Sequence, residues 1–270
     1  MTKAVMTIPQ PLDQPGRRAD WWRAIWPAVL TFMLGIGLWE GVVGFFALPL
    51  YLLPAPSQIL DTFRAQPGYL LSIGAVTFGN AFAGCVFGCG LGVLTAIICV
   101  RWPLIGEGLV PLAVAASAVP IIALSPLMSL WLGSISPASK IAVVAVMTFF
   151  PTLVSVYKGL ISPRADALQL MHSYAAAQRA IFLKLRVPAA LPFFFNALRV
   201  CTTLSMIGAV VAEFFGGPQN ALGVYIKTQA GVLRTREAWS AILVACLYGL
   251  AFYVVVVLIE RAVMPWNKHR

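Results

Sequence analysis

Charged side chains are scarce in this sequence. Only 10% of its 270 residues are Asp, Glu, Lys or Arg, whereas 60% are hydrophobic. Soluble domains average about 25% charged residues, so the composition excludes a soluble globular protein and predicts an integral membrane protein in contact with the lipid bilayer. Negative charge is scarcer than positive charge, because the sequence has 9 acidic residues and 19 basic ones. Because the basic residues are scattered at the ends of apolar runs, we expect no nucleic-acid partner.

Residues that carry catalysis are equally few. The only histidines, His172 and His269, lie outside the apolar runs, so neither can serve a catalytic triad or metal site within the membrane. The sequence holds no G-x-x-x-x-G-K-[ST] motif, which excludes a phosphate-binding loop of that kind. We therefore predict no enzyme activity, no metal site and no cofactor. A membrane enzyme or an assembly scaffold is the disfavoured alternative.

The five cysteines all lie within apolar runs, and their odd number argues against a disulfide framework. We interpret them as small packing residues: Cys85, Cys89, Cys99, Cys201 and Cys246.

Six apolar runs are long enough to cross a hydrocarbon core of about 30 Å, which needs about 20 helical residues. We therefore predict an all-α integral membrane protein with a cytoplasmic segment over 1–23, a six-span domain over 24–260 and a cytoplasmic tail over 261–270. The spans are expected at 24–48, 70–100, 108–132, 139–160, 188–212 and 241–259. The third contains Pro111, Pro120 and Pro126, so it is either kinked beside a cavity or a bent packing helix.

The distribution of basic residues predicts that both termini are cytoplasmic. This orientation places thirteen Lys and Arg inside and five outside, with Arg199 unassigned. The five outside residues are Arg64, Lys140, Lys227, Arg234 and Arg236.

Residues 162–187 form the only long internal segment that is too polar for lipid. We expect this elbow between spans four and five to fold into short helices, with Ser162 as N-cap, Pro163 at the first helical position and Asp166 near the positive end of the dipole. One interpretation is a solvated loop. The other is a docking element for a soluble partner.

The elbow resembles the EAA loop of bacterial ABC-importer permeases, whose pattern is E-A-A, three residues, G, nine residues and I-x-L-P. Leu185 to Pro188 matches the I-x-L-P end, so the glycine position falls on Ala175 and E-A-A on Gln169, Leu170 and Met171. The acidic residue and the glycine are both replaced. We predict that Ala175 keeps a right-handed conformation, because a positive φ costs alanine steric strain at its Cβ atom. Segments 186–192 and 211–213 also look like that family.

The resemblance implies a permease subunit of an ATP-driven importer in the bacterial inner membrane. Its implied partners are two copies of a separate ABC ATPase, a periplasmic substrate-binding protein and a second permease copy in a homodimer. Gln169, Leu170, Met171, Ala175 and Pro188 would transmit motion between ATPase and spans. To these coupling residues we add, from polarity and position, His172, Tyr174 and Arg179.

The chain looks most similar to the branch for nitrate, sulfonate and taurine and for pyrimidine or riboflavin precursors. The segments 170–174 and 213–217 favour a pyrimidine- or riboflavin-type precursor, with nitrate, sulfonate or taurine as the alternative. An ion-coupled secondary transporter is the alternative of another class.

Two stripes of residues stand out within the spans. Asn80, Gly84, Gly88 and Gly92 recur every four residues and predict close packing of the second span against another helix. The fifth span carries a polar stripe that indicates either a translocation path or hydrogen bonding between helices, and it ends in an acid: Asn196, Arg199, Thr203, Met206 and Glu213. For Glu40 and Glu213 we favour structural pairing or gate closure, and for Glu260 an interfacial place beside Arg261.

Overall fold

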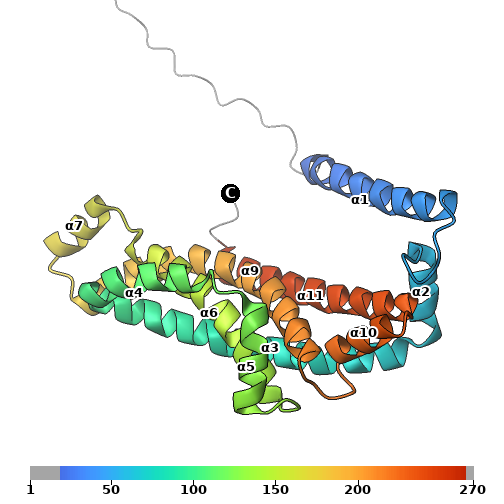
Figure 1. Ribbon diagram of the computed structural model, residues 1–270. Coiled ribbons are helices and arrows are strands. Elements are labelled where there is room, and N and C mark those ends of the chain that lie inside the picture. The colour runs from blue at the N-terminus through green and yellow to red at the C-terminus, as the bar shows by residue number, and fades with distance from the viewer. Residues whose placement is uncertain (1–18, 266–270) are drawn as a thin grey trace, which may run out of the picture. The chain divides into compact units, whose positions relative to one another are not determined.

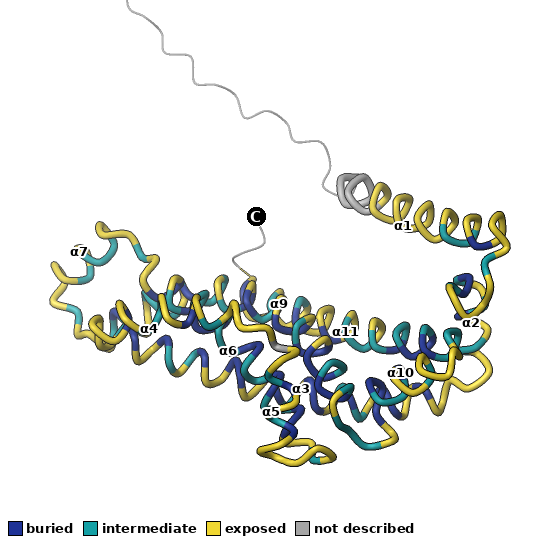
Figure 2. The backbone as a smooth tube through the Cα atoms, in the orientation of Figure 1, coloured by how far each residue is buried: buried dark blue, intermediate teal, exposed yellow. Residues whose placement is uncertain are grey.

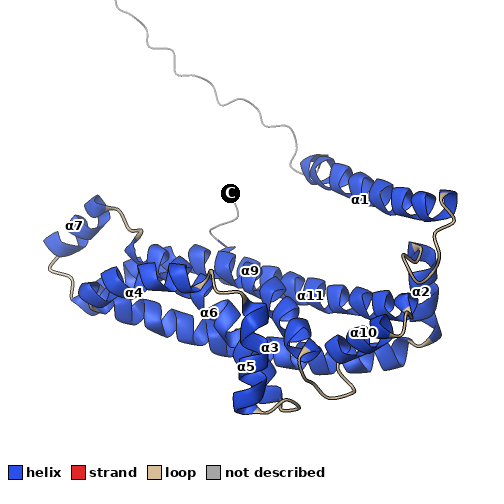
Figure 3. Ribbon diagram, viewed as in Figure 1, coloured by secondary structure: helices blue, strands red, loops and turns tan. Residues whose placement is uncertain are grey.

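The computed structural model describes residues 19–265, and all regular structure among them is helical (Figure 3). The chain divides into two units, residues 1–58 and 59–270. Its elements are α1 (Ala19–Phe45), α2 (Pro56–Ala65), α3 (Pro67–Arg101), α4 (Pro103–Ala116), α5 (Ile121–Leu132), α6 (Pro137–Ile161), α7 (Ala165–Ser173), α8 (Gln178–Ile181), the π-helix η1 (Phe182–Arg186), α9 (Val187–Phe214), α10 (Leu222–Gly231) and α11 (Thr235–Val263).

In the first unit, the apolar part of α1 is the first predicted span. Its side chains from Trp26 onward are largely exposed, as expected of a helix surrounded by lipid. Glu40 accepts hydrogen bonds from the hydroxyl of Ser57 at 2.7 Å and from its backbone N–H at 3.1 Å. A carboxylate thus satisfies a free N–H group at the start of α2, which is the structural pairing favoured for Glu40.

Within residues 19–265, five helices are long and apolar enough to cross a membrane. They coincide with the first, second, fourth, fifth and sixth predicted spans, which confirms these five apolar runs as helices. A short helix, α10, lies between the helices of the fifth and sixth predicted spans.

The third predicted span, 108–132, is not one continuous helix. The chain forms α4 with 14 residues and α5 with 12, and each is shorter than the roughly 20 residues needed to cross a bilayer. The interruption falls at residues 117–120. Pro120 has no N–H to donate and disfavours helical geometry at the residue before it, so the helix ends there.

Long helices α3, α6 and α9 pack side by side at the centre of the second unit (Figure 1). Glycine lets α3 approach α6 closely: a Cβ atom on Gly84 would lie 2.5 Å from Cβ of Val144, and one on Gly92 would lie 2.9 Å from the carbonyl oxygen of Phe149. At Gly88 an added Cβ would overlap the backbone carbonyl of Ala145. All members of the stripe are buried, Asn80 included, and its glycines lie on the surface of α3 that packs against α6.

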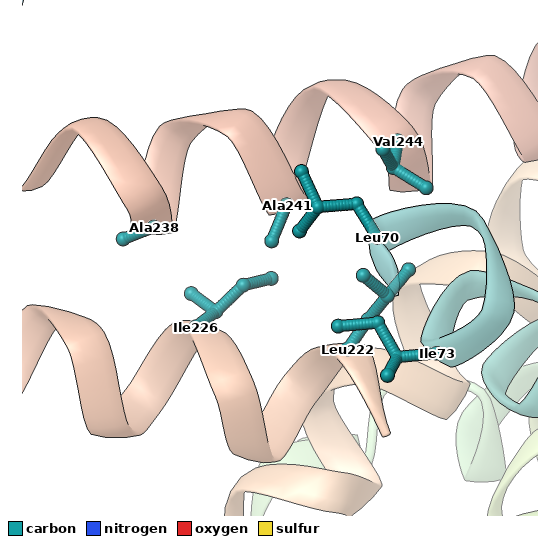
Figure 4. Packing of buried hydrophobic residues seen from close by; sticks show 7 residues of the cluster. All are labelled: Leu70, Ile73, Leu222, Ile226, Ala238, Ala241 and Val244. Carbon is teal, nitrogen blue, oxygen red and sulfur yellow. The ribbon is translucent and has the colours of Figure 1, made fainter. Parts of the chain in front are cut away.

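A second contact joins α10 and α11 to the start of α3. Seven buried apolar side chains meet there (Figure 4): Leu70, Ile73, Leu222, Ile226, Ala238, Ala241 and Val244. This cluster fixes α10 although the helix has only ten residues and would be marginal alone.

Buried positions recur along α3, α6 and α9, whereas many outward positions are exposed (Figure 2). Several of these exposed side chains are large and apolar, such as Phe87, Leu94 and Leu250. Such an outer surface fits helices that are solvated by lipid. Of the cysteines, Cys246 is exposed while the other four are buried, so interpreting all five as packing residues is wrong for Cys246.

Candidate functional site

The elbow between α6 and α9 consists of α7, α8 and η1 and lies at the opposite end of the long helices from α10 (Figure 1). Helix α7 has no buried residue. Asp166 lies in its first turn, as expected, and pairs with Arg164 at 3.1 Å. The N-cap prediction is wrong: Ser162 follows α6 and donates its hydroxyl to the carbonyl of Gly159, while α7 starts three residues later. The fourth span continues to Ile161, which leaves Ser162 at its end.

The prediction for the backbone at Ala175 is also wrong. This residue has φ of 51°, in the left-handed region. The Ala176 N–H reaches back to the carbonyl of Met171 at 3.0 Å, and the Ala175 N–H reaches that of His172 at 2.9 Å. A left-handed residue after a helix lets the chain satisfy such terminal carbonyls while it reverses. These bonds compensate the steric penalty of about 1–2 kcal/mol for alanine.

The coupling residues predicted in the elbow differ in exposure. Met171 is half-buried, whereas the side chains of Leu170 and Tyr174 are 57% and 78% exposed. Because positions four apart on a helix are neighbours, Leu170 and Tyr174 form the outward apolar pair of the elbow, and the half-buried Met171 is not part of it. The remaining predicted residues are also exposed: Gln169, His172, Ala175, Arg179 and Pro188.

Helix α9 is entered through the π-helical turn η1, in which the N–H of Val187 bonds to the carbonyl of Phe182. Pro188 follows directly. A proline lacks the N–H and its ring would clash with the carbonyl four residues earlier in a regular α-helix. A wider turn before Pro188 gives that carbonyl room, which explains a π-turn at this site.

The structure separates the polar residues predicted along the fifth span. Asn196 and Thr203 lie on an exposed face of α9, together with Phe193, Val200 and Ile207. Met206 is instead buried.

Arg199 and Glu260 form an ion pair, in which the Arg199 Nε donates to Glu260 Oε2 at 2.7 Å. The sequence placed Glu260 beside Arg261. Its partner is instead 61 residues away in the chain, and no local pattern signals it.

Glu213 is buried in a polar network at the other end of α9. Its Oε2 accepts hydrogen bonds from the Thr77 hydroxyl at 3.0 Å and from the Gly223 N–H at 2.8 Å. The Thr77 oxygen in turn accepts from the Leu222 N–H at 2.9 Å. The network therefore satisfies two N–H groups in the first turn of α10 and joins that helix to α3 and α9.

Lys140 lies close enough to Glu213 for a direct electrostatic interaction. It is fully buried and donates to the backbone carbonyls of Ser134 and Ser136 and to the Ser139 hydroxyl. From the sequence, Lys140 is predicted only as one of the five outside basic residues, and Thr77 is not predicted as a site residue. The one available signal was a lysine three residues after Pro137, at the start of an apolar run.

Residues 88–269, more than half of the chain, match the family model described as binding-protein-dependent transport system inner membrane component. The formylaminopyrimidine transport permease protein ThiX of Halalkalibacterium halodurans is 30% identical over 248 residues, covering 92% of this chain and 98% of ThiX. The riboflavin transport system permease protein RibX of Chloroflexus aurantiacus is 28% identical over 249 residues, covering 90% of this chain and 91% of RibX.

Among solved structures, a chain of the MetNI methionine ABC transporter in an inward-facing conformation has a similar fold. Its TM-score is 0.53 at 20% sequence identity, and the match covers 70% of this chain and 91% of that one.

Proposed function

Because the chain belongs to the binding-protein-dependent transport system inner membrane components, the permeases of ABC importers, we propose that it forms the transmembrane path for one small solute. The chain is a multi-pass, all-helical subunit without catalytic activity, and ATP is hydrolysed by a separate ATPase subunit. In our proposal α4 and α5 together make the third of six crossings, both termini are cytoplasmic, and the membrane is the bacterial inner membrane.

The observation that carries the proposal is the elbow. A segment of 26 residues, 162–187, leaves the long helices and presents α7 with no side chain buried. Exposed apolar residues such as Leu170 and Tyr174 are costly to keep in water unless a partner covers them. We propose that α7 inserts into a groove of the ATPase, and that two permease copies each engage one ATPase subunit.

The path itself is assigned to the exposed face of α9. We propose that Asn196 and Thr203 face the solute from this side, and that the same face of a second permease copy completes the path. Polar groups in a span require protein or water rather than lipid around them, which supports this assignment. Arg199 and Met206 belong to the packing of α9 instead, because one is paired with Glu260 and the other is buried.

For the solute we propose a pyrimidine- or riboflavin-type precursor, with nitrate, sulfonate or taurine as the alternative. The similarity to ThiX, a formylaminopyrimidine transport permease protein, and to RibX, a riboflavin transport system permease protein, supports the first class. Delivery to the outer face would be by a periplasmic binding protein, in keeping with the family.

The test is uptake into vesicles that hold the permease and its ATPase, with the binding protein outside. Labelled formylaminopyrimidine, riboflavin and taurine are compared with and without internal ATP and with a protonophore. We expect uptake of one heterocyclic solute that requires ATP and persists when the proton gradient is dissipated. Uptake that continues without ATP and stops with the protonophore would establish an ion-coupled carrier instead.

A further inference from the structure

A cleft of about 750 Å³ lies between the C-terminal end of α3 and the segment formed by α8 and η1. Its lining is mostly of two kinds. Arg101, Arg179 and Arg186 supply positive charge, and apolar residues, Ile97 and Leu183 among them, form the rest of the wall with the neutral polar side chain of Gln178. No acidic side chain lines it.

The positive charge in this cleft is uncompensated. Within residues 19–265, none of the three arginines forms an ion pair with an acid. Three guanidinium groups in one cleft repel one another and together favour an anion. Their planar donor sets match phosphate oxygens, which guanidinium groups bind with paired hydrogen bonds. The positive charge therefore favours an anionic ligand, and a phosphate group fits the paired N–H donors of the guanidinium groups.

The surroundings of the cleft are those of a membrane surface. Arg101 is the last residue of α3, a helix apolar enough to cross a membrane, and the Trp102 ring centroid lies 6.0 Å from the Arg101 guanidinium carbon. Trp beside a basic residue at the end of a span marks the level of the lipid headgroups. One and two turns back along α3, Ile98 and Leu94 are exposed apolar side chains, so the wall near Ile97 continues into the lipid-facing surface.

We propose that this cleft binds an anionic phospholipid, with its phosphate held by the three arginines and an acyl chain along the apolar wall. A free anion would use only the arginines, whereas the adjoining apolar surface of α3 fits the chain of a lipid. The π-turn η1 contributes to both parts, because it carries Leu183 and Arg186. The bound lipid would tie the end of α3 to the base of the elbow.

The experiment measures lipid retention by the full-length protein in detergent, using native mass spectrometry with equimolar phosphatidylglycerol and phosphatidylcholine. The test variant is the double substitution Arg101→Gln and Arg186→Gln. Arg179 stays unchanged because it is also a proposed coupling residue. The control removes the same charge outside the cleft, at two exposed lysines of the same region, Lys158→Gln and Lys184→Gln. No ATPase is present, so the result is independent of the docking proposal.

We expect wild type and control to retain phosphatidylglycerol in preference to phosphatidylcholine. In the test variant the preference should fall by about thirtyfold, the effect of losing two hydrogen-bonded guanidinium contacts to the lipid phosphate. Raising the salt concentration should weaken phosphatidylglycerol retention by wild type and leave phosphatidylcholine unchanged, which tests the proposal even if the variant does not fold.

Three results would overturn the proposal. They are equal retention of the two lipids by wild type, an equal loss in the test and control variants, and full displacement of phosphatidylglycerol by inorganic phosphate at a comparable concentration. The last would identify a free-anion site.

Discussion

The carboxylate of Glu213 accepts a hydrogen bond from the Thr77 hydroxyl at 3.0 Å, although 136 residues separate the two in the chain. The same hydroxyl accepts the N–H of Leu222. Thr77 thus acts as donor to one element and acceptor from another, and no apolar residue of equal size can replace both functions. The position of α10 depends on this one side chain as well as on the apolar cluster around Leu222.

Replacing Thr77 with valine should destabilise the protein by about 1–3 kcal/mol, because it leaves the buried N–H of Leu222 without a partner and removes one of the two hydrogen bonds to Glu213 Oε2. Thr77→Ser should keep most of the free energy of unfolding of the wild type, since serine retains the hydroxyl. Thermal unfolding in detergent measures the difference. The control is Thr95→Val in the same helix, whose hydroxyl bonds only to the carbonyl of Leu91 one turn back. Equal effects of the two valine substitutions would contradict a role for the Glu213 network.

Gly88 and Gly90 form a matched pair in α3. An added Cβ at Gly88 would overlap Ala145 of α6, whereas one at Gly90 meets nothing within 4 Å. Gly88→Ala should therefore cost about 1–3 kcal/mol through overpacking. Gly90→Ala should be neutral or stabilise by up to about 1 kcal/mol, because alanine is the better helix former. Unfolding midpoints of the two variants in one detergent provide the comparison. Similar losses at both sites would show that α3 and α6 are not in close contact.

The left-handed residue Ala175 gives a prediction of increased local stability. Glycine adopts this conformation without the steric penalty, although its greater freedom when unfolded offsets part of the gain. Ala175→Gly should thus slow amide hydrogen exchange at Ala176, whose N–H closes the end of α7. Ala167→Gly, inside α7, is the control and should speed exchange. Faster exchange in both variants would argue against the left-handed conformation.

The docking proposal predicts the effect of charge on the exposed pair of α7. Leu170→Asp with Tyr174→Asp removes two apolar anchors and places two carboxylates in a desolvated groove. Anchors of this kind are often worth at least 2 kcal/mol each, so affinity for the ATPase should fall at least a hundredfold. Co-purification and ATP-driven uptake measure it. Because both side chains are exposed, the variant should still fold.

The control for this experiment carries the same charges at exposed apolar positions away from the elbow, Ile135→Asp with Val232→Asp. It should bind the ATPase as wild type does. If the elbow variant also assembles and transports normally, α7 is only a solvated loop.

Length and hydropathy were sufficient to predict which helices among residues 19–265 are long and apolar enough to cross a membrane, since a run of 20 apolar residues has few other solutions. They were insufficient at Pro120, because the same composition suits a kinked helix and a broken one. Whether the chain bends or stops depends on which neighbours complete the freed backbone groups. Similarly, the sequence identified the elbow from its polarity, yet Ser162 suits the end of α6 as well as the start of α7.

The partners of polar residues were the least predictable part of the site. The bonds from Glu213 to Thr77 and from Arg199 to Glu260 join residues far apart in the chain, and a single sequence holds no signal for such pairs. At Ala175, residue preference favoured right-handed geometry, and the need to close α7 outweighed it. The position that carries glycine in the EAA-type pattern is thus left-handed in this chain, although it carries alanine.

The interruption between α4 and α5 has a consequence for hydration. The last carbonyls of α4 have local partners, since Ser117, Ala118 and Val119 donate their N–H groups to the carbonyls of Ala113, Ala115 and Ala116. The bonds from Ala118 and Val119 span only three residues, and such turns have poorer hydrogen-bond geometry than an α-helix. If water competes for these groups, deuterium should enter the amides of Ala118 and Val119 sooner than those of the neighbouring helical turns. Residues 117–120 would then be a hydrated interruption in an otherwise dehydrated helix bundle.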